Sequence, residues 1–237
     1  MTYIEGFVCA VPASNKEAYR KHAAEAEPLF KQFGATRIVE AWADDVPDGK
    51  VTDFKGAVQA KDDEKVVFSW IEYPSKDARN AANEKMMSDP RMKEMGATMP
   101  FDAKRMIMGG FATIQDEGTS AVMGYTDGYL AAVPADGRDA YLEFATKTGE
   151  IFREHGATRV VDSWEDDVPD GKLTDFRRSV KAEKSEKVAF AWIEWPSKAA
   201  RDEGWKKVTE DPRMQEMKMP FDGKRIVYGG FEPILDR

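Results

Sequence analysis

The stretch that decides the fold is Trp42-Ala-Asp-Asp-Val-Pro-Asp-Gly-Lys-Val-Thr-Asp-Phe54. It returns 122 residues later as Trp164-Glu-Asp-Asp-Val-Pro-Asp-Gly-Lys-Leu-Thr-Asp-Phe176. A second motif, Met-Pro-Phe-Asp, begins at residues 99 and 219, so the spacing has fallen to 120. A repeat of this length far exceeds the roughly 20–50 residues of a solenoid unit, so each copy can have its own core. We therefore predict two similar domains, residues 1–118 and 119–237.

The 237-residue chain is acidic, with a formal net charge of −8. It lacks the stripe of Lys and Arg that neutralises phosphates, which disfavours nucleic acid as a partner. No apolar stretch is long enough for a membrane span, and the N-terminus does not resemble a signal peptide. Cys9 is the only cysteine, which excludes an intrachain disulfide and a cysteine-cluster metal site. We expect a cytoplasmic protein that binds neither nucleic acid nor membrane.

Each half has the local signals of a β-α-β-β-α-β unit. In the first half, residues 3–11 alternate large and small side chains, as a half-buried strand does. A helical pattern follows, with Ser14 or Asn15 available as its N-cap and Gly34 placed to end it. The remaining signals predict three strands and a second helix, at residues 36–44, 64–73 and 104–114 and from Ser75 onward. This order predicts an α+β fold of two ferredoxin-like domains, each an antiparallel sheet with both helices on one face.

The uncovered face of each sheet is predicted to be aromatic. With the strands in the spatial order 4-1-3-2, counting every second residue gathers large and acidic side chains on this face. Those of the first half are Glu5, Phe7, Glu40, Trp42, Phe68, Trp70 and Glu72, and their counterparts are Asp127, Tyr129, Asp162, Trp164, Phe190, Trp192 and Glu194. Because such aromatics are costly to leave in water, we infer that the two faces pack together across a pseudo-twofold axis. One chain would then be an intrachain pseudo-dimer.

Four motifs, shared in order by both halves, resemble a known family. In the first half they are Trp42-x-Asp-Asp-Val-Pro-Asp-Gly-Lys50, Phe68-Ser-Trp-Ile-Glu-Tyr-Pro-Ser-Lys76, Asp89-Pro-Arg-Met92 and Pro100-Phe-Asp-x-Lys-Arg-Met-x-x-Gly-Gly-Phe111. They resemble the YbaA-like family of small bacterial proteins of unknown function, within the dimeric α/β-barrel superfamily. The resemblance implies a tandem fusion of two copies that enclose a barrel. The superfamily includes cofactor-free oxygenases, isomerases, haem enzymes and ligand-binding domains, so it does not imply one substrate.

Four carboxylates are the candidate catalytic residues: Glu5, Glu72, Asp127 and Glu194. In an antiparallel sheet the start of the first strand lies beside the end of the third, so we expect the two acids of each half to be near neighbours. Two such acids either take up a proton, with a raised pKa that suits general acid/base chemistry, or find a cation. In the second case they lie at the barrel mouth, solvated or paired with an arginine such as Arg37 or Arg105.

The candidate ligand-binding residues are aromatic side chains of the two faces and acids of the repeated loop that begins at residues 44 and 166. They are Phe7, Trp42, Asp45, Asp48, Phe68, Trp70, Tyr129, Trp164, Asp167, Asp170, Phe190 and Trp192. The aromatic set would shape a pocket, and the loop could form a lid whose polar groups bond the ligand. The same Pro-Asp-Gly chemistry is equally that of a turn held by its own side chains.

The sequence points to no cofactor and no metal. His22 aligns with Phe144 and His155 with Phe33, which excludes a haem or His-ligated metal present in both halves and leaves only an asymmetric site open. Neither a glycine-rich phosphate loop nor a nucleophile motif is present.

Two smaller repeated features each have two interpretations. Arg91 and Arg213 follow Asp-Pro and either hold an anionic group or pair with a nearby acid. The glycine pairs 109–110 and 229–230 lie within the last strand of each half and mark either a bulge or the close approach of a ligand.

Two classes of function remain. The first is a cofactor-independent enzyme that acts on a small aromatic or enolisable molecule, with carboxylates moving protons. The second is a non-catalytic module that binds a metabolite or another protein. A closed cavity with a buried, protonated carboxylate would favour the enzyme, whereas a barrel filled by its own side chains would leave only surface binding.

Overall fold

The computed structural model describes residues 2–119 and 123–237. The first half contains β1 (Tyr3–Pro12), η1 (Ala13–Asn15), α1 (Lys16–Phe33), β2 (Arg37–Asp45), α2 (Phe54–Ala57), β3 (Glu64–Tyr73), α3 (Lys76–Ser88), α4 (Pro90–Ala97), η2 (Ala103–Arg105) and β4 (Ile107–Gly118). The second half contains β5 (Tyr125–Pro134), η3 (Ala135–Gly137), α5 (Arg138–Glu154), β6 (Arg159–Asp167), α6 (Phe176–Ser179), β7 (Glu186–Trp195), α7 (Lys198–Glu210), α8 (Pro212–Glu216), η4 (Gly223–Arg225) and β8 (Val227–Asp236). Each half is the predicted β-α-β-β-α-β unit, with two additional short α-helices, α2 and α4 in the first half and α6 and α8 in the second.

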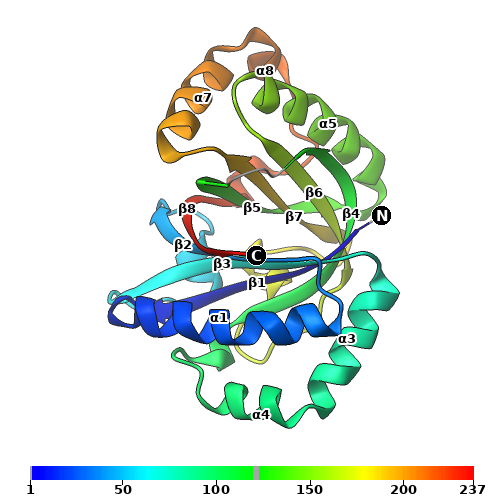
Figure 1. The fold of residues 1–237 in the computed structure, drawn as a ribbon. Helices are drawn as coiled ribbons and strands as arrows, with labels where there is room; N and C mark the ends of the chain where they lie inside the picture. Colours follow the sequence, from blue (N-terminus) through cyan, green and yellow to red (C-terminus); the bar gives the residue numbers. More distant parts are fainter. Residues whose placement is uncertain (1, 120–122) are drawn as a thin grey trace.

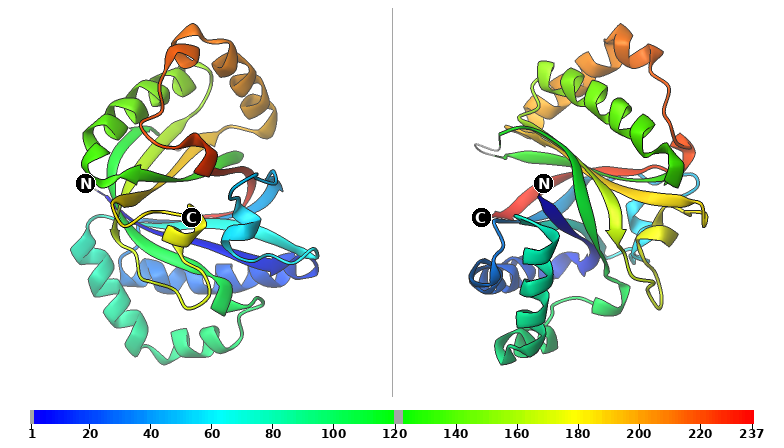
Figure 2. Two further views of the ribbon diagram at one scale, coloured as in Figure 1. Left: turned by 180° about the vertical axis from the view of Figure 1, so that it is seen from behind. Right: turned by 90° about the vertical axis from the view of Figure 1, so that its right-hand side faces the viewer.

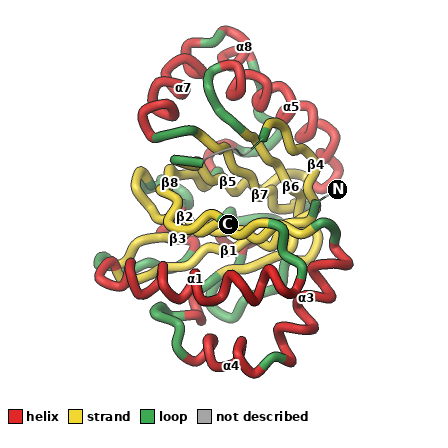
Figure 3. Tube along the Cα trace, in the orientation of Figure 1, coloured by secondary structure: helices red, strands yellow, loops and turns green. Residues whose placement is uncertain are grey.

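The eight strands close into one antiparallel barrel (Figure 1), in the order β1-β3-β2-β8-β5-β7-β6-β4. Within each half the spatial order is the predicted 4-1-3-2. Two seams join the halves, because β2 pairs with β8 and β4 pairs with β6. The long helices lie outside the strands on opposite sides of the barrel, α1 and α3 on one side and α5 and α7 on the other (Figures 2 and 3). Closing the barrel in this way pairs both edges of each four-stranded sheet.

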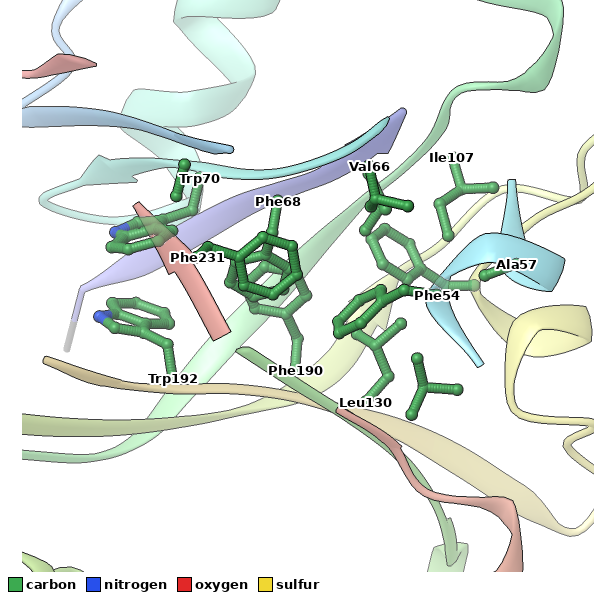
Figure 4. Packing of buried hydrophobic residues seen from close by; sticks show 14 of the residues in the cluster. Phe54, Ala57, Val66, Phe68, Trp70, Ile107, Leu130, Phe190, Trp192 and Phe231 are labelled. Carbon is green, nitrogen blue, oxygen red and sulfur yellow. The ribbon is translucent and has the colours of Figure 1, made fainter. Parts of the chain in front are cut away.

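Aromatic side chains fill the barrel (Figure 4). Trp70 stacks on Trp192 with ring centroids 4.5 Å apart, and Phe68 stacks on Phe190 at 4.8 Å. All four residues are fully buried. Burial of one such side chain stabilises by about 1.5–3 kcal/mol, and a favourable aromatic pair adds about 0.5–1.5 kcal/mol. The prediction that the two halves bury their aromatic residues against each other is confirmed for these four residues.

The short helices α2 and α6 close one end of this aromatic column. Phe54 of α2 packs edge to face on Phe68 at 5.6 Å and on Phe231 at 5.3 Å. Phe176 of α6 packs in the same way on Phe111 at 5.2 Å. The repeated motif that decides the fold therefore ends in a phenylalanine because that side chain stops one end of the barrel.

In the first and second strands of each half, the side chains predicted to point into the barrel point to the helices, and the others point into the barrel. In the pairing of β1 with β3, Gly6 lies opposite Trp70 and Glu5 lies opposite Ile71. Because paired residues share a face, Gly6 points into the barrel and Glu5 points to the helices. The predicted face is wrong for Glu5, Phe7, Glu40, Trp42, Asp127, Tyr129, Asp162 and Trp164, and right for Phe68, Trp70, Glu72 and their counterparts. A one-residue difference in register moves every side chain of a strand to the other face.

Local signals set most of the helix ends. Gly34 ends α1 in the left-handed region at φ 116°, and Ser75 caps α3 by accepting a 3.1 Å hydrogen bond from the Ala78 amide. Asn15 precedes α1 but its side chain does not cap it, because the amide donates to the Pro100 carbonyl at 2.9 Å. This hydrogen bond instead ties the start of α1 to the segment before β4.

Within the part of the chain that the structure describes, no helix is long and apolar enough to cross a membrane. The expected cytoplasmic location stays a prediction, as does the division of the chain between residues 118 and 119.

Replacing Gly6 with Ala should destabilise the protein by about 1–3 kcal/mol, the usual cost of overpacking a core. An added Cβ would lie 2.7 Å from a ring atom of Phe190, which is itself held by Phe68. Gly96 in α4 is the control, because an added Cβ there has no atom within 4 Å and Ala favours the helix. Urea unfolding measures both variants, and a wild-type midpoint for Gly6→Ala would contradict the tight packing.

Candidate functional site

The end of the barrel opposite α2 and α6 is closed by buried ion pairs that cross between the halves. Arg37 of β2 donates to Glu194 at 2.6 Å, and Arg159 of β6 donates to Glu72 at 2.7 Å. The diagonal contacts are longer, 3.5 Å from Arg37 to Glu72 and 3.4 Å from Arg159 to Glu194. Of the two outcomes considered for these acids, pairing with a cation is the one found, and Arg37 is the expected partner. The other arginine considered, Arg105, pairs with Glu64 at 2.6 Å.

Further groups complete this network. The indole N–H groups of Trp70 and Trp192 donate to Glu72 and Glu194, at 3.2 and 2.9 Å. Asp236 accepts from Arg37, and Asp116 accepts from Arg159, both at 2.8 Å. Burial alone would lower the pKa of each arginine, but hydrogen bonds to these acids raise it above its usual range. With both guanidinium groups permanently charged, the two glutamates are fixed hydrogen-bond acceptors.

The other two predicted catalytic acids lie on the helix side of the sheets. Glu5 is 3.3 Å from Arg79 of α3, and Asp127 is 2.8 Å from Arg201 of α7. Burial raises the pKa of both carboxyl groups, and the neighbouring arginines oppose the rise. Asp127 also accepts hydrogen bonds from two indole groups, those of Trp195 and Trp205, each at 2.9 Å.

The prediction that Glu5 and Glu72 are near neighbours is wrong. Glu72 lies opposite Ile4 in the β1–β3 pairing, so the two acids point to opposite faces of the sheet. The second half repeats the arrangement, with Glu194 opposite Thr126. A proton shared between the two acids of one half is therefore not possible in this structure.

The last residues of β2 and β6 are acids that bind the helices of the opposite half. Arg79 donates to Asp167 at 2.7 Å, and Arg201 donates to Asp45 at 2.8 Å. Two of the predicted ligand-binding residues, Asp45 and Asp167, therefore hold the halves together. Asp170 is exposed and lines a shallow surface hollow of about 430 Å³.

The loop after β2 is fixed in place by its own side chains and by the second half. Asp53 accepts hydrogen bonds from the Gly49 and Gly56 amides at 2.9 and 2.6 Å. Thr52 donates to the Ser179 carbonyl across the halves. Asp48 pairs with Lys55 of α2, at 2.6 Å. These contacts match the interpretation of the loop as a turn tied by its own residues, although no regular tight turn forms at residues 46–49.

A cavity of about 160 Å³ lies between the sheet of the second half and its helices. The strands supply Tyr129, Ala131, Ala189 and Ala191 to its wall, and the helices and the segment after them supply Tyr141, Phe144, Phe152, Trp205, Met214 and Phe221. Most of this lining is apolar. Of the predicted ligand-binding residues, Tyr129 and Trp192 contribute to the cavity, whereas Phe68, Trp70 and Phe190 are packed inside the barrel.

One carboxylate lies in the wall of this cavity. Asp162 of β6 accepts a 2.7 Å hydrogen bond from the Tyr141 hydroxyl of α5, and only 8% of the residue is exposed. Burial raises the pKa of Asp162 from an ordinary 3.8 to about 6, although the hydrogen bond from Tyr141 lowers it. Its second oxygen accepts no hydrogen bond from the described residues. Asp162 is therefore a buried group that can take up or release a proton near neutral pH.

The equivalent positions of the first half carry larger side chains. Glu40 stands where the second half has Asp162, and it accepts a 2.7 Å hydrogen bond from Tyr19. Ser69 and Cys9 occupy the positions of Ala191 and Ala131. Burial raises the pKa of Glu40, and the nearby hydroxyl groups of Tyr19 and Ser69 counter the effect. Three neighbouring positions are thus smaller in the second half, around Asp162.

Sequence reasoning missed Asp162 as a site residue, because counting placed it on the barrel face. A difference between the repeats could have identified this site. The first half has Cys9, Glu40 and Ser69 where the second half has Ala131, Asp162 and Ala191. Each change removes atoms at one place in the fold, and that place is recognisable only when the strand register is known.

The remaining predicted features have structural roles. Arg91 pairs with Asp89 at 2.6 Å and Arg213 with Asp211 at 2.8 Å, as the acid-pairing interpretation expects. The pairing of β4 with β6 shifts register at Gly110, which indicates a bulge. Among residues 2–119 and 123–237, no group of three or more His, Cys, Asp or Glu side chains could hold a metal ion.

The fold defines this chain as an intrachain dimeric α/β barrel made of two repeats. The chain belongs to the family described as "Protein of unknown function (DUF1428)", which matches residues 2–103 and 124–223. It is 71% identical over 117 residues to "Uncharacterized protein YbaA" of Escherichia coli K12, and equally to that of Shigella flexneri. Each match covers 49% of this chain and 100% of the relative. The relatives therefore correspond in length to one half of this protein.

Solved structures share the whole architecture at low sequence identity. Two proteins with the printed name "putative monooxygenase", from Fusobacterium nucleatum and Lactobacillus acidophilus, give TM-scores of 0.62 and 0.60 at 10% identity. The matches cover 100% of this chain and 94% and 96% of those chains. An "anthrone oxidase-like protein" gives a TM-score of 0.55, also at 10% identity, with 100% and 92% covered. At this identity the similarity shows the fold alone.

Replacing Arg159 with Met should destabilise the protein by about 3–5 kcal/mol, because Glu72 and Asp116 would lose their partner in a buried network. The matched control is Arg91→Met, which removes an exposed ion pair and should hardly shift the unfolding midpoint. Urea unfolding at neutral pH compares the two, and equal small effects would show that the network does not hold the barrel closed.

Proposed function

We propose that the second half of this protein binds a small, largely apolar molecule in the cavity beside Asp162, and that Asp162 accepts a proton from it. The observation that carries the proposal is a buried carboxylate with one unbonded oxygen in the wall of an apolar cavity. The substrate class that suits it is a compact aromatic or enolisable molecule with one acidic hydrogen.

The lining supports binding through apolar burial. Phe144, Phe152, Trp205 and Phe221 offer ring faces and edges that contact an apolar ligand on several sides. Each Å² of apolar surface removed from water contributes about 25 cal/mol, so a ring-sized ligand gains several kcal/mol before its ordering cost is subtracted. Pockets of this composition, with one placed polar group, are typical small-molecule sites.

The chemistry follows from the state of Asp162. A base is most useful when its pKa lies near the working pH, and burial raises the pKa of Asp162 to about 6. Tyr141 holds one oxygen at 2.7 Å and so orients the carboxylate. The other oxygen could take a proton from an O–H group or from a carbon next to a carbonyl, and return it to the same ligand. Such a step needs no cofactor.

The four carboxylates first considered for catalysis fit this chemistry less well, since each is held by an arginine. The filled barrel also leaves the aromatic residues at its centre in contact with one another. The proposed site therefore lies between the sheet and the helices of the second half, and not inside the barrel or in both halves.

Phenol should raise the melting temperature of the wild-type protein, and Ala191→Leu should abolish this shift by filling the cavity. Ala199→Leu, at an exposed position of α7, is the control and should keep the shift.

In D2O the protein should also speed hydrogen–deuterium exchange at the acidic carbons of 2-indanone, measured by NMR, and Asp162→Asn should remove this acceleration. Absence of any phenol-induced shift contradicts binding. Binding without accelerated exchange would favour the non-catalytic module.

Asp162→Asn should make the protein more stable at high pH. An acid whose folded pKa is raised binds more protons in the native state, so stability falls as pH rises from 3.8 through about 6. Above that window the ionised Asp162 costs about 3 kcal/mol, at 1.36 kcal/mol per pKa unit. The gain of the variant should therefore be greatest above pH 6 and disappear below about pH 4.

Urea unfolding at pH 4, 6 and 8 checks this difference, with Asp170→Asn as an exposed control that should show no such trend. A gain for Asp162→Asn that is the same at all three pH values would show that Asp162 titrates as an ordinary carboxyl group.

A further inference from the structure

A second hollow adjoins the cavity of the second half, and one side chain borders both. The hollow has a volume of about 440 Å³ and opens to the surface. Residues 47–53 of the first half line one side of it, and Gly223, Lys224, Ile226 and Tyr228 of the second half line the other. Ile226 also lines the cavity beside Asp162. Both spaces therefore contact Ile226, which is only partly buried.

The charges around this hollow are unevenly matched. Asp48 is paired with Lys55 at 2.6 Å, and Asp53 accepts hydrogen bonds from two amides of its own loop. Within the described residues, Lys50 and Lys224 also line the hollow but form no ion pair. Both lysine ammonium groups are therefore free to contact an anionic group in the hollow, whose lining also contains the carboxyl groups of Asp48 and Asp53.

The loop that carries Lys50 has a fixed position. Thr52 donates to the Ser179 carbonyl of the second half, and Val46 packs against Gly229 so closely that an added Cβ there would lie 2.8 Å from it. The first half therefore supplies one lysine at a defined place beside the cavity of the second half.

We propose that the cavity and the hollow form one binding site shared by the two halves, and that its ligand is amphipathic. A compact apolar ring occupies the cavity, and an anionic group passes Ile226 and lies in the hollow near Lys50 and Lys224. This inference rests on the proposed function, because it requires an occupied cavity, and it adds the class of ligand.

Two probes separate the two parts of the site. Phenol fits the cavity alone, whereas 3-(4-hydroxyphenyl)propanoate carries the same ring and a carboxylate that can reach the hollow. The wild-type protein should bind the propanoate about tenfold more tightly than phenol at low salt, since each of two exposed ion pairs contributes modestly to binding. Calorimetry or NMR titration measures both dissociation constants, and higher salt should reduce the difference.

The double variant Lys50→Gln/Lys224→Gln should lose this tenfold gain and bind phenol as the wild type does. Its matched control is Lys172→Gln/Lys104→Gln, which changes the equivalent positions of the repeat and the net charge by the same amount. The control should keep the gain. If phenol binds but the propanoate gains nothing, or both double variants lose the gain equally, this inference is overturned while the proposed function stands. If neither probe binds, the proposed function itself fails.

Discussion

The stacking of Trp70 on Trp192 and of Phe68 on Phe190 is the interaction on which the rest of the structure depends. These rings come from equivalent strands of the two repeats, so neither half can bury them alone. Glycine is required beneath them, because a Cβ at Gly6 or Gly128 would lie within 3.0 Å of the phenylalanine from the other half. The barrel is therefore a joint core, and its ends are closed by α2 and α6 and by the arginine–glutamate network.

Rings occupy the centre of the barrel. The cavity proposed as the binding site therefore lies outside the barrel, between the sheet and the helices of the second half. Gene fusion has a physical consequence here, because two copies in one chain can differ while a homodimer must repeat every residue. Glu40 and Asp162 show the result, since both accept a hydrogen bond from a tyrosine and the shorter acid lies in the wall of a cavity. The sites of the two halves are therefore not equivalent.

Much of the fold could be predicted from local patterns. The repeat, the order of strands and helices, the ends at Gly34 and Ser75 and the burial of Trp70 against its counterpart all follow from the sequence. The sequence could not predict which side chains of β1 and β2 point into the barrel, because this depends on which residue lies opposite Trp70. Whether that residue is Gly6 or Phe7 is decided by space for Phe190, a residue of the other half.

The sequence by itself determined that two like units share one chain, that their aromatic strands need each other, and that acids placed among these aromatics either take up a proton or find a cation. These follow from composition and from periods of two and 3.6 residues, which are local properties. Only the tertiary structure decided that Arg37 and Arg159 are those cations, and that Asp162 borders a cavity. Both depend on strand register and on contacts between residues more than 20 positions apart, which local periodicity does not encode.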